Sequence, residues 1–398
     1  MKNTEGAEAG YFDPKACDLE EFAALIDRAT EPREVPQATE IAKNVPIYDV
    51  AALGSALDEP RARRELMAEW ARVLRSGAGV LVLRGACPDR AALEGAARVF
   101  EAIIAEEKAA NEGGADHFAA AGSNDRVWNA LQKLCERAPD LHLRCFASPG
   151  IAAVCEAWLG PGYQMTAQVN LVYPGGAPQE AHRDFHLGFQ TAAVAATYPA
   201  HVHDLSPVLT LQGAVAHCDI PLGSGPTKLL PFSQTYRPGY VAWRRDDFRA
   251  LFEERYVQVP LATGDALFFN PALFHAAGAN VSADIRRMAN LLQVSSAFGR
   301  AMESVDRTAM CKRLYPHALA AHRAGDPGRL ALKAAIAATA EGYAFPTNLD
   351  RDPPSGGLAP ESQQAFFLRA LEEAMSEDVF AAHLDAMVAK QRADTISG

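Results

Sequence analysis

Two side chains that can bind a metal ion, His182 and Asp184, stand two positions apart in the sequence. In an extended strand, side chains alternate between the two faces, so these two would point the same way. A third ligand must come from elsewhere, and His275 is the best candidate. Two imidazoles and one carboxylate leave open positions on one side of a metal, which is typical of non-haem Fe(II) centres that use O₂. The spacing therefore predicts an iron site, although the same spacing also arises by chance in solvated or packed histidines.

Two nearby histidine patterns imitate this site. His186 extends it to H-x-D-x-H, but a substrate contact or a strand-end histidine fits it better than a fourth ligand. His201 and His203 stand in a turn-rich segment that has no downstream partner. We therefore interpret none of these three residues as a metal ligand.

The elements that must hold the site are expected to be short strands. Residues 165–173 form a strand pattern that Pro174-Gly175-Gly176 stops. The other expected strands are 80–83, 208–219, 227–231, 257–261, 266–270 and 288–296. We expect 257–261 and 266–270 to pair across the turn Thr263-Gly264-Asp265. Many short strands separated by Gly/Pro turns predict a sandwich or barrel.

Helical patterns surround this β-rich region. They cover 61–75, 89–107, 148–159, 327–341, 361–375 and 378–392. The simplest organisation is one domain over 1–398, with a helical and strand region (1–162), a β core (163–297) and a helical extension (298–398). The apolar faces of the last helices are open to two interpretations, a cover for the core or the face of a homodimer.

Composition limits the classes of partner and compartment. The chain has 398 residues, 49% hydrophobic and 22% charged, enough for a large buried core. A net charge of -11 argues against a nucleic-acid or acidic-membrane partner. We see no bilayer-spanning apolar run, and the polar start of the chain shows no signal-peptide pattern. Seven dispersed cysteines without a C-x-x-C motif indicate reduced thiols, so we expect a cytoplasmic protein.

An ordered set of motifs surrounds the three candidate ligands. The set is NLVYPG (170–175), His182-x-Asp184, GPTKLLPFS (225–233), GDALFF (264–269), HAAGANVS (275–282) and Arg286. In this order it resembles the phytanoyl-CoA dioxygenase family of Fe(II)- and 2-oxoglutarate-dependent oxygenases, which includes the ectoine hydroxylases. The resemblance covers roughly residues 60–300. It implies an α+β fold whose core is a double-stranded β-helix, a cupin-like jelly roll, with helices on either side.

The resemblance also implies roles for individual residues. His182, Asp184 and His275 would bind Fe(II), with 2-oxoglutarate and O₂ as cosubstrates. Arg286 would clamp the far carboxylate of 2-oxoglutarate, because a guanidinium fork matches a carboxylate. Arg287 is the alternative clamp, and only one of these neighbours can face the pocket if both lie in a strand.

Three further residues are candidates for contact with the cosubstrate. Asn170 matches a family position of this kind, Gln168 shares its strand face, and Ser282 is a weaker candidate. The reaction implied is hydroxylation of a small organic substrate, with release of succinate and CO₂. The presence of Asp184 favours hydroxylation, desaturation or ring chemistry over halogenation, because related halogenases lack this carboxylate.

Two other functions are compatible with the same candidate ligands. A cupin-type metalloenzyme could use the same three ligands without redox chemistry, and a catalytically silent β-helix protein could serve as a binding module. A carboxylate clamp argues against the first, and an intact ligand set argues against the second. The substrate is not identified, because the family acts on acyl-CoA thioesters, amino-acid derivatives and natural products. A local basic patch formed by Arg237, Arg244 and Arg245 could bind an anionic one.

Overall fold

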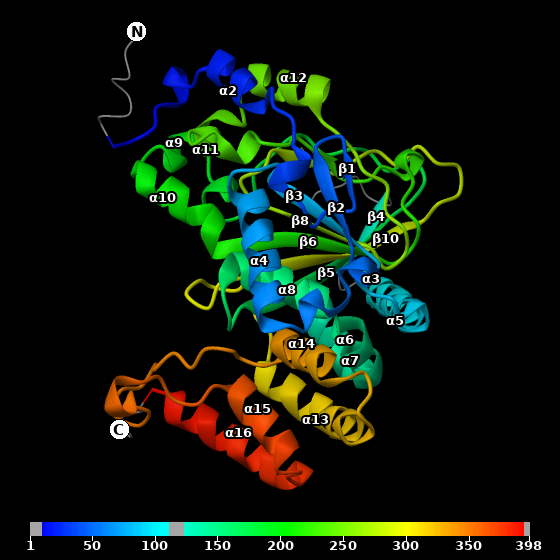
Figure 1. The fold of residues 1–398 in the computed structure, drawn as a ribbon, viewed down its shortest axis with the longest axis vertical. Coiled ribbons are helices and arrows are strands. Elements are labelled where there is room, and N and C mark those ends of the chain that lie inside the picture. The colour runs from blue at the N-terminus through cyan, green and yellow to red at the C-terminus, as the bar shows by residue number, and fades with distance from the viewer. Residues whose placement is uncertain (1–9, 111–122, 394–398) are drawn as a thin grey trace.

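The computed structural model describes residues 10–110 and 123–393. The first nine residues, where we expect no signal peptide, lie outside this part of the chain. Helices and strands carry the labels of Figure 1. Among the described residues, no helix is both long and apolar enough to cross a membrane.

A large mixed sheet forms the centre of the molecule. Its eight strands lie in the order β1-β2-β3-β8-β6-β10-β5-β4, and every pair is antiparallel except β2 and β3. The strands are β1 (Glu40–Ala42), β2 (Val45–Asp49), β3 (Val80–Arg84), β4 (Asn124–Val127), β5 (Gln164–Val172), β6 (Thr210–Ala216), β8 (Ala266–Phe269) and β10 (Arg287–Ser295). This sheet is the major wall of the expected jelly roll.

A smaller sheet forms the opposite wall. Its two strands, β7 (Lys228–Leu229) and β9 (His275–Ala276), pair antiparallel. Isolated bridges extend it on both sides, from His182 to His275 and from Leu229 to Val257. The candidate ligands His182 and His275 are therefore neighbours in this small wall.

Helices cover the other face of the large sheet and both ends of the molecule. They are α2 (Leu19–Ile26), α3 (Val50–Leu53), α4 (Pro60–Arg75), α5 (Arg90–Ala109), α6 (Ala130–Arg137), α7 (Pro139–Phe146), α8 (Pro149–Leu159), α9 (Ala192–Ala195), α10 (Ala200–Leu205), α11 (Gly239–Ala242), α12 (Asp246–Arg255), α13 (Arg307–Ala324), α14 (Arg329–Thr339), α15 (Gln363–Glu372) and α16 (Glu377–Gln391). Helices α4, α6, α8 and α14 pack on the sheet, whereas α15 and α16 form an outer layer at the end away from α2 and α12 (Figure 1).

Local sequence explains why the major helix α4 forms where it does. Glu59 precedes it and accepts hydrogen bonds from the backbone N–H groups of Arg61 and Ala62, while Pro60 fits the first turn. Its apolar side chains, Trp70 among them, are buried against the sheet and neighbouring helices. The expected helix is thus confirmed within one residue at its start.

Strand alternation separates the two faces of the large sheet. In β8, Phe268 belongs to the apolar core shared with the helices, whereas Leu267 and Phe269 face the interior between the sheets. The same alternation along β5 and β10 decides which of their polar residues reach the site. The fold class expected from sequence, α+β with a jelly-roll core, is confirmed.

The sheet extends beyond the expected limits of 163–297. Four of its strands, β1 to β4, come from the region before residue 163. Of these, the sequence indicated only β3, because β1 and β4 have three and four residues and β2 contains Pro46. Runs so short do not complete the alternation that marks a strand.

The expected hairpin between 257–261 and 266–270 is wrong. β8 lies between β3 and β6 in the large sheet, whereas Val257 bridges to Leu229 in the small wall. Asp265 explains the change of wall, because its carboxylate accepts hydrogen bonds from the N–H groups of both Gly85 and Ala262. The turn is thus tied to the end of β3, and the chain crosses from one sheet to the other.

Candidate active site

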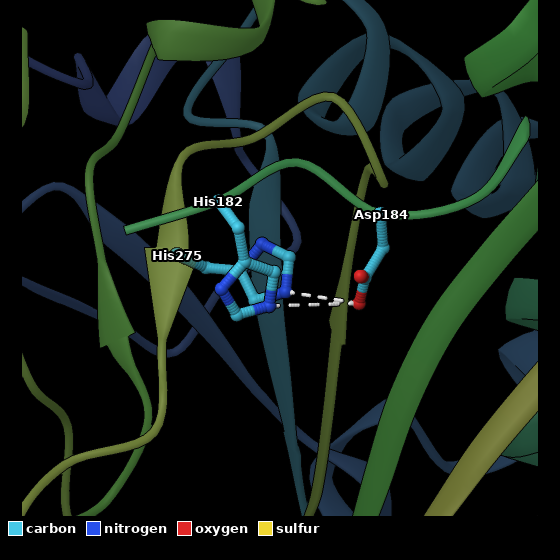
Figure 2. A group of neighbouring side chains, drawn as sticks. All are labelled: His182, Asp184 and His275. Carbon is cyan, nitrogen blue, oxygen red and sulfur yellow. Dashed lines mark ion pairs between the residues drawn. The ribbon is translucent and has the colours of Figure 1, made fainter. Parts of the chain in front are cut away.

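The three expected metal ligands meet at one point. Each of His182, Asp184 and His275 offers a ligand atom, and these atoms lie within 4.8 Å of one another. The Oδ2 atom of Asp184 is 3.8 Å from Nε2 of His182 and 3.4 Å from Nε2 of His275. Figure 2 shows the two imidazoles side by side, both directed at the carboxylate.

Backbone contacts fix the orientation of both imidazoles. The backbones of His182 and His275 exchange hydrogen bonds of 3.0 and 3.2 Å. Nδ1 of His182 lies 2.8 Å from the carbonyl oxygen of Glu180, and Nδ1 of His275 lies 2.9 Å from that of Leu273. Each Nδ1 therefore carries the proton, which leaves the Nε2 lone pair free for a metal.

Asp184 lies in an irregular segment of the chain and not within a regular strand. Its N–H donates to the carbonyl oxygen of Pro271, and the next two residues, Phe185 and His186, have positive φ angles of 60° and 41°. Strain of this kind is kept where surrounding packing enforces it, and Phe185 is fully buried. The strand expected over this segment is thus reduced to one bridge, at His182.

Gln212 of β6 holds the carboxylate of Asp184. Its side-chain N–H donates to Oδ2 of Asp184 at 2.5 Å. Burial disfavours the charged carboxylate, but His182, His275 and this hydrogen bond outweigh it and hold the pKa of Asp184 below its usual value. Burial, more than any other cause, lowers the pKa of His182, so this imidazole is neutral at pH 7. A neutral imidazole and an ionised carboxylate are the protonation states that metal binding needs.

The ligands line a cavity of about 900 Å³ between the two sheets. Apolar side chains such as Leu261, Leu267 and Phe269 form part of its wall. Polar groups from several strands also reach it, including Gln212 and Asn170. The volume is large enough for a cosubstrate and a small organic substrate together.

Of the two adjacent arginines, Arg287 enters the cavity and Arg286 does not. Arg287 begins β10 and lies on the same face as Ala289 and Leu291, which also line the cavity. Arg286 is half exposed, pairs with Glu101 at 3.1 Å and lies over the ring of Tyr173. The expectation that Arg286 faces the site is therefore wrong, because strand alternation directs it outwards.

The guanidinium of Arg287 is buried without a carboxylate among the described residues. Its Nη1 donates to the carbonyl oxygens of Ser224 and Gly278, at 3.0 and 3.2 Å. Gly225 (φ 75°) makes this anchor possible, since a Cβ there would lie 2.2 Å from the Ala279 carbonyl oxygen. Burial lowers the pKa of Arg287 only to about 10, so it stays charged at pH 7. A fixed, unpaired cation in a cavity is suited to a carboxylate ligand.

The site and its surroundings match a known family. The family model of phytanoyl-CoA dioxygenase (PhyH) matches residues 76–288. The chain belongs to this family. The family's cofactors are Fe(II) and 2-oxoglutarate, and the convergent Nε2 atoms and carboxylate are a donor set that fits Fe(II).

Two solved structures match this chain at low similarity. The epimerase SnoN from nogalamycin biosynthesis is 22% identical, with a TM-score of 0.40, over 60% of this chain and 82% of that one. The carbocyclase SnoK from the same biosynthesis is 21% identical, with a TM-score of 0.40, over 59% of this chain and 86% of that one. Both are described as non-haem α-ketoglutarate-dependent enzymes. No match to a curated protein was found.

The remaining residues expected in this PhyH-family site divide into two groups. Asn170 and Gln168 line the cavity from β5, on one face as expected. Oδ1 of Asn170 is buried without a hydrogen-bond partner among the described residues, whereas Gln168 is held by Arg126 and Gln293. Ser282 does not belong to the cavity wall.

Ser282 instead stabilises the turn that follows β9. Its hydroxyl donates to the side-chain oxygen of Asn280 and accepts from the N–H of Ile285. Asn280 in turn donates to the carbonyl oxygens of Val172 and Ile285. The expected cosubstrate contact by Ser282 is therefore wrong, and its role is structural.

The other histidines considered from sequence do not join the ligand cluster. Nδ1 of His186 lies 3.3 Å from the hydroxyl of Ser206, and Nε2 of His203 lies 3.0 Å from the Ala195 carbonyl oxygen. His201 is exposed on α10.

Sequence reasoning missed three residues of the site: Gln212, Arg249 and Glu303. Gln212 could have been found, since a polar residue at the start of a buried strand needs a partner. Arg249 lies on α12 and Glu303 on an irregular segment, and both line the cavity. Neither carries a local signal, because only the tertiary fold brings them to the site.

Proposed function

We propose that this chain is an Fe(II)- and 2-oxoglutarate-dependent dioxygenase that hydroxylates a small organic substrate and releases succinate and CO₂. One observation supports it above the others. A two-histidine, one-carboxylate cluster and a buried arginine without an acidic partner line the same cavity. The first set suits Fe(II), and the second suits the far carboxylate of 2-oxoglutarate.

Each residue has a separate task in this proposal. His182 and His275 present their Nε2 atoms to the metal, and Gln212 holds the Asp184 carboxylate in place. Arg287 binds the far carboxylate of 2-oxoglutarate and so orients the cosubstrate in the cavity. When bound, Fe(II) activates O₂ and couples decarboxylation of 2-oxoglutarate to oxidation of the substrate. Asp184 occupies the position a halide would need, which favours hydroxylation over halogenation.

The cavity also supports water exclusion during the reaction. Leu261, Leu267 and Phe269 line it with apolar surface, and the ring centre of Phe269 lies 4.6 Å from that of His275, with the two rings tilted by 56°. A dry wall beside the ligands strengthens their electrostatic contacts and limits side reactions. Neither a non-redox metalloenzyme nor a silent binding module has a use for Arg287 placed beside this ligand set.

The test is succinate formation from 2-oxoglutarate under air, with Fe(II), ascorbate and a panel of candidate substrates. We expect wild type to produce succinate and His182→Ala to lose at least about 10³-fold of the rate, because the metal loses a ligand. His201→Ala, an exposed histidine outside the cavity, should match wild type.

Direct binding distinguishes the alternatives if wild type makes no succinate. Metal binding without 2-oxoglutarate binding would replace the proposal with a non-redox metalloenzyme. Binding of neither would replace it with a silent module.

A further inference from the structure

The rim of the cavity carries positive charge that the metal and cosubstrate do not use. Arg244 and Arg249 both line the cavity, and both of their guanidinium groups lie over the ring of Trp243. The guanidinium of Arg244 lies 3.9 Å from the centre of the Trp243 ring, and that of Arg249 lies 5.7 Å from it. We call these three residues the rim cluster.

Arg244 has no acidic partner among the described residues. Its Nε and Nη2 donate to one acceptor, the carbonyl oxygen of Gln190, at 3.2 and 3.1 Å. These bonds and the indole face fix the plane of the guanidinium while Nη1 stays available. A guanidinium held in this way can accept an anion with little loss of side-chain freedom.

Arg249 is only partly neutralised. Its Nη2 pairs with the carboxylate of Glu180 at 3.0 Å, but Glu180 is three-quarters exposed. Its Nε is buried and has no hydrogen-bond partner among the described residues. One exposed carboxylate therefore balances only part of the charge of Arg249, whose side chain lines the cavity.

The rim cluster is attached directly to the metal site. Glu180 connects them, because its side chain pairs with Arg249 while its carbonyl oxygen holds Nδ1 of His182. A group bound at the rim would therefore place the rest of a small molecule beside the metal ligands.

Two other arginines nearby are fully paired with carboxylates, unlike Arg244 and Arg249. Arg237 forms a two-point contact with Asp204, and Arg245 forms one with Asp247. Neither of them lines the cavity, so the basic patch expected from sequence is reduced to Arg244, with Arg249 added. At the rim, Glu180 is the one carboxylate that pairs with Arg244 or Arg249 among the described residues, so the rim cluster keeps a positive charge. The chain as a whole has a net charge of -11.

We propose that Arg244 and Arg249 bind an anionic group of the substrate, a carboxylate or a phosphate, and so select an anionic organic substrate. This inference rests on the proposed function, because it assigns one end of that enzyme's substrate. The anion contacts the guanidinium groups of both arginines, with the indole of Trp243 packed against the adjoining carbon atoms.

The experiment compares matched acids and amides as ligands of the full-length protein loaded with Mn(II), with and without 2-oxoglutarate. The pairs are benzoate and benzamide, 3-phenylpropionate and its amide, and hexanoate and its amide, with phenyl phosphate against phenol as the phosphate arm. Calorimetric titration gives each affinity. We expect at least one anion to bind about tenfold or more tightly than its neutral partner, the usual advantage of a charge-assisted contact.

Three variants locate the effect. Arg244→Gln should abolish the preference for the anion while keeping 2-oxoglutarate affinity, which also shows that it is folded. Arg255→Gln, which removes an exposed arginine on α12 outside the cavity, should keep the preference. Arg287→Gln should lose 2-oxoglutarate affinity and keep the preference.

The outcomes distinguish this inference from the proposed function. Equal binding of every anion and its neutral partner overturns the inference. A preference that disappears in Arg287→Gln but not in Arg244→Gln also overturns it, because the anion then occupies the cosubstrate position. Failure of 2-oxoglutarate to bind wild type overturns the proposed function, and with it the substrate role of the rim, whatever the anions do. A preference carried by phenyl phosphate alone supports the inference and assigns a phosphate.

Discussion

Two buried arginines in different regions illustrate how this molecule separates stability from chemistry. Arg307, at the start of α13, is 7% exposed, and Arg287, at the start of β10, is 8% exposed. Arg307 donates to three backbone carbonyls, those of Ala338, Thr339 and Met165. Arg287 uses only Nη1 for such bonds and lies in the cavity wall. A satisfied buried cation joins segments of the fold, whereas one that faces a cavity is available to a ligand.

The surroundings of the two arginines differ in the same way. The C-terminal layer is filled by stacked rings, with Phe380 3.9 Å from Tyr315 between ring centres. The cavity wall instead holds buried polar atoms without partners among the described residues, such as Oδ1 of Asn170 and Oε1 of Gln212. The C-terminal layer contributes stability through packing. The cavity wall is less stabilising, because its polar groups are left available to bind ligands.

The largest expected effect is a loss of stability in the tightly packed C-terminal layer. Phe380→Ala should lower the free energy of unfolding by about 3–5 kcal/mol, because it removes a buried ring that contacts Tyr315, Phe366 and Phe367. Urea unfolding measures this change. Val379→Ala, an exposed neighbour on the same helix, should stay within about 0.5–1 kcal/mol. Weakened Mn(II) binding by folded Phe380→Ala would show that the two regions are coupled.

The adjacent residues Arg286 and Arg287, at the start of β10, test the cavity region of this comparison. Arg287→Gln should weaken 2-oxoglutarate binding about 100-fold, since it removes a charge-assisted contact from a buried position. Arg286→Gln should change it less than about twofold, because Arg286 is half exposed and pairs with Glu101. Calorimetric titration of the Mn(II)-loaded proteins gives both affinities. Equal losses in the two variants, or a larger loss in Arg286→Gln, would contradict the placement in the structure.

The same pair shows what the sequence could and could not establish. The motif order was sufficient for the fold class and for His182, Asp184 and His275, because the His-x-Asp pair is a local pattern and the resemblance of the ordered motifs indicates which distant histidine joins it. The choice between Arg286 and Arg287 depends on where β10 begins and which face it presents. Strand alternation restricts the choice to one of them, but only the register of β10 against β5 and β6 decides it.

Other features depended entirely on tertiary structure. β8 joins β3 and β6 because Asp265 ties its turn to the end of β3, a contact across 180 residues. Arg249 and Glu303 reach the cavity from segments that carry no strand pattern. Contacts of this kind form between residues far apart in sequence, so no local pattern encodes them.

A buried histidine away from the cavity gives a smaller effect that depends on pH. Nε2 of His142 donates to the hydroxyl of Thr339, and burial lowers the pKa of His142 to about 3. The unfolded chain binds this proton near pH 6.5, so stability is full above that pH and is lost as the pH falls towards 3. Between pH 7 and pH 5 this residue should cost about 2 kcal/mol of unfolding free energy.

His142→Gln tests this effect, because glutamine can keep the bond to Thr339 without titrating. Its loss of stability from pH 7 to pH 5 in urea unfolding should be smaller than that of wild type by about 2 kcal/mol. His201→Gln, at an exposed position, should follow the wild-type curve. An unchanged slope in His142→Gln would mean that other groups cause the acid sensitivity.

The smallest effect concerns Gln212. A role in stabilising the fold and a role in orienting Asp184 predict opposite results for its substitution. If Gln212 served mainly to stabilise the fold, Gln212→Leu would destabilise the metal-free protein. In the cavity interpretation Gln212 orients Asp184, so Gln212→Leu should weaken Mn(II) binding about tenfold. The metal-free protein should lose little stability, since Oε1 of Gln212 is already buried without a partner among the described residues.

Gln293→Leu is the matched control for this measurement. Gln293 lies opposite Gln212 on β10 and lines the same cavity, but its side chain contacts Gln168 and not Asp184. Metal titration should therefore show wild-type affinity in Gln293→Leu and a loss only in Gln212→Leu. Equal losses would mean that the general polarity of the wall, and not the bond to Asp184, sets the metal affinity. Gln212→Leu could instead lower the unfolding free energy of the metal-free protein by more than it lowers the free energy of Mn(II) binding. Gln212 would then serve mainly to stabilise the fold, as Arg307 does.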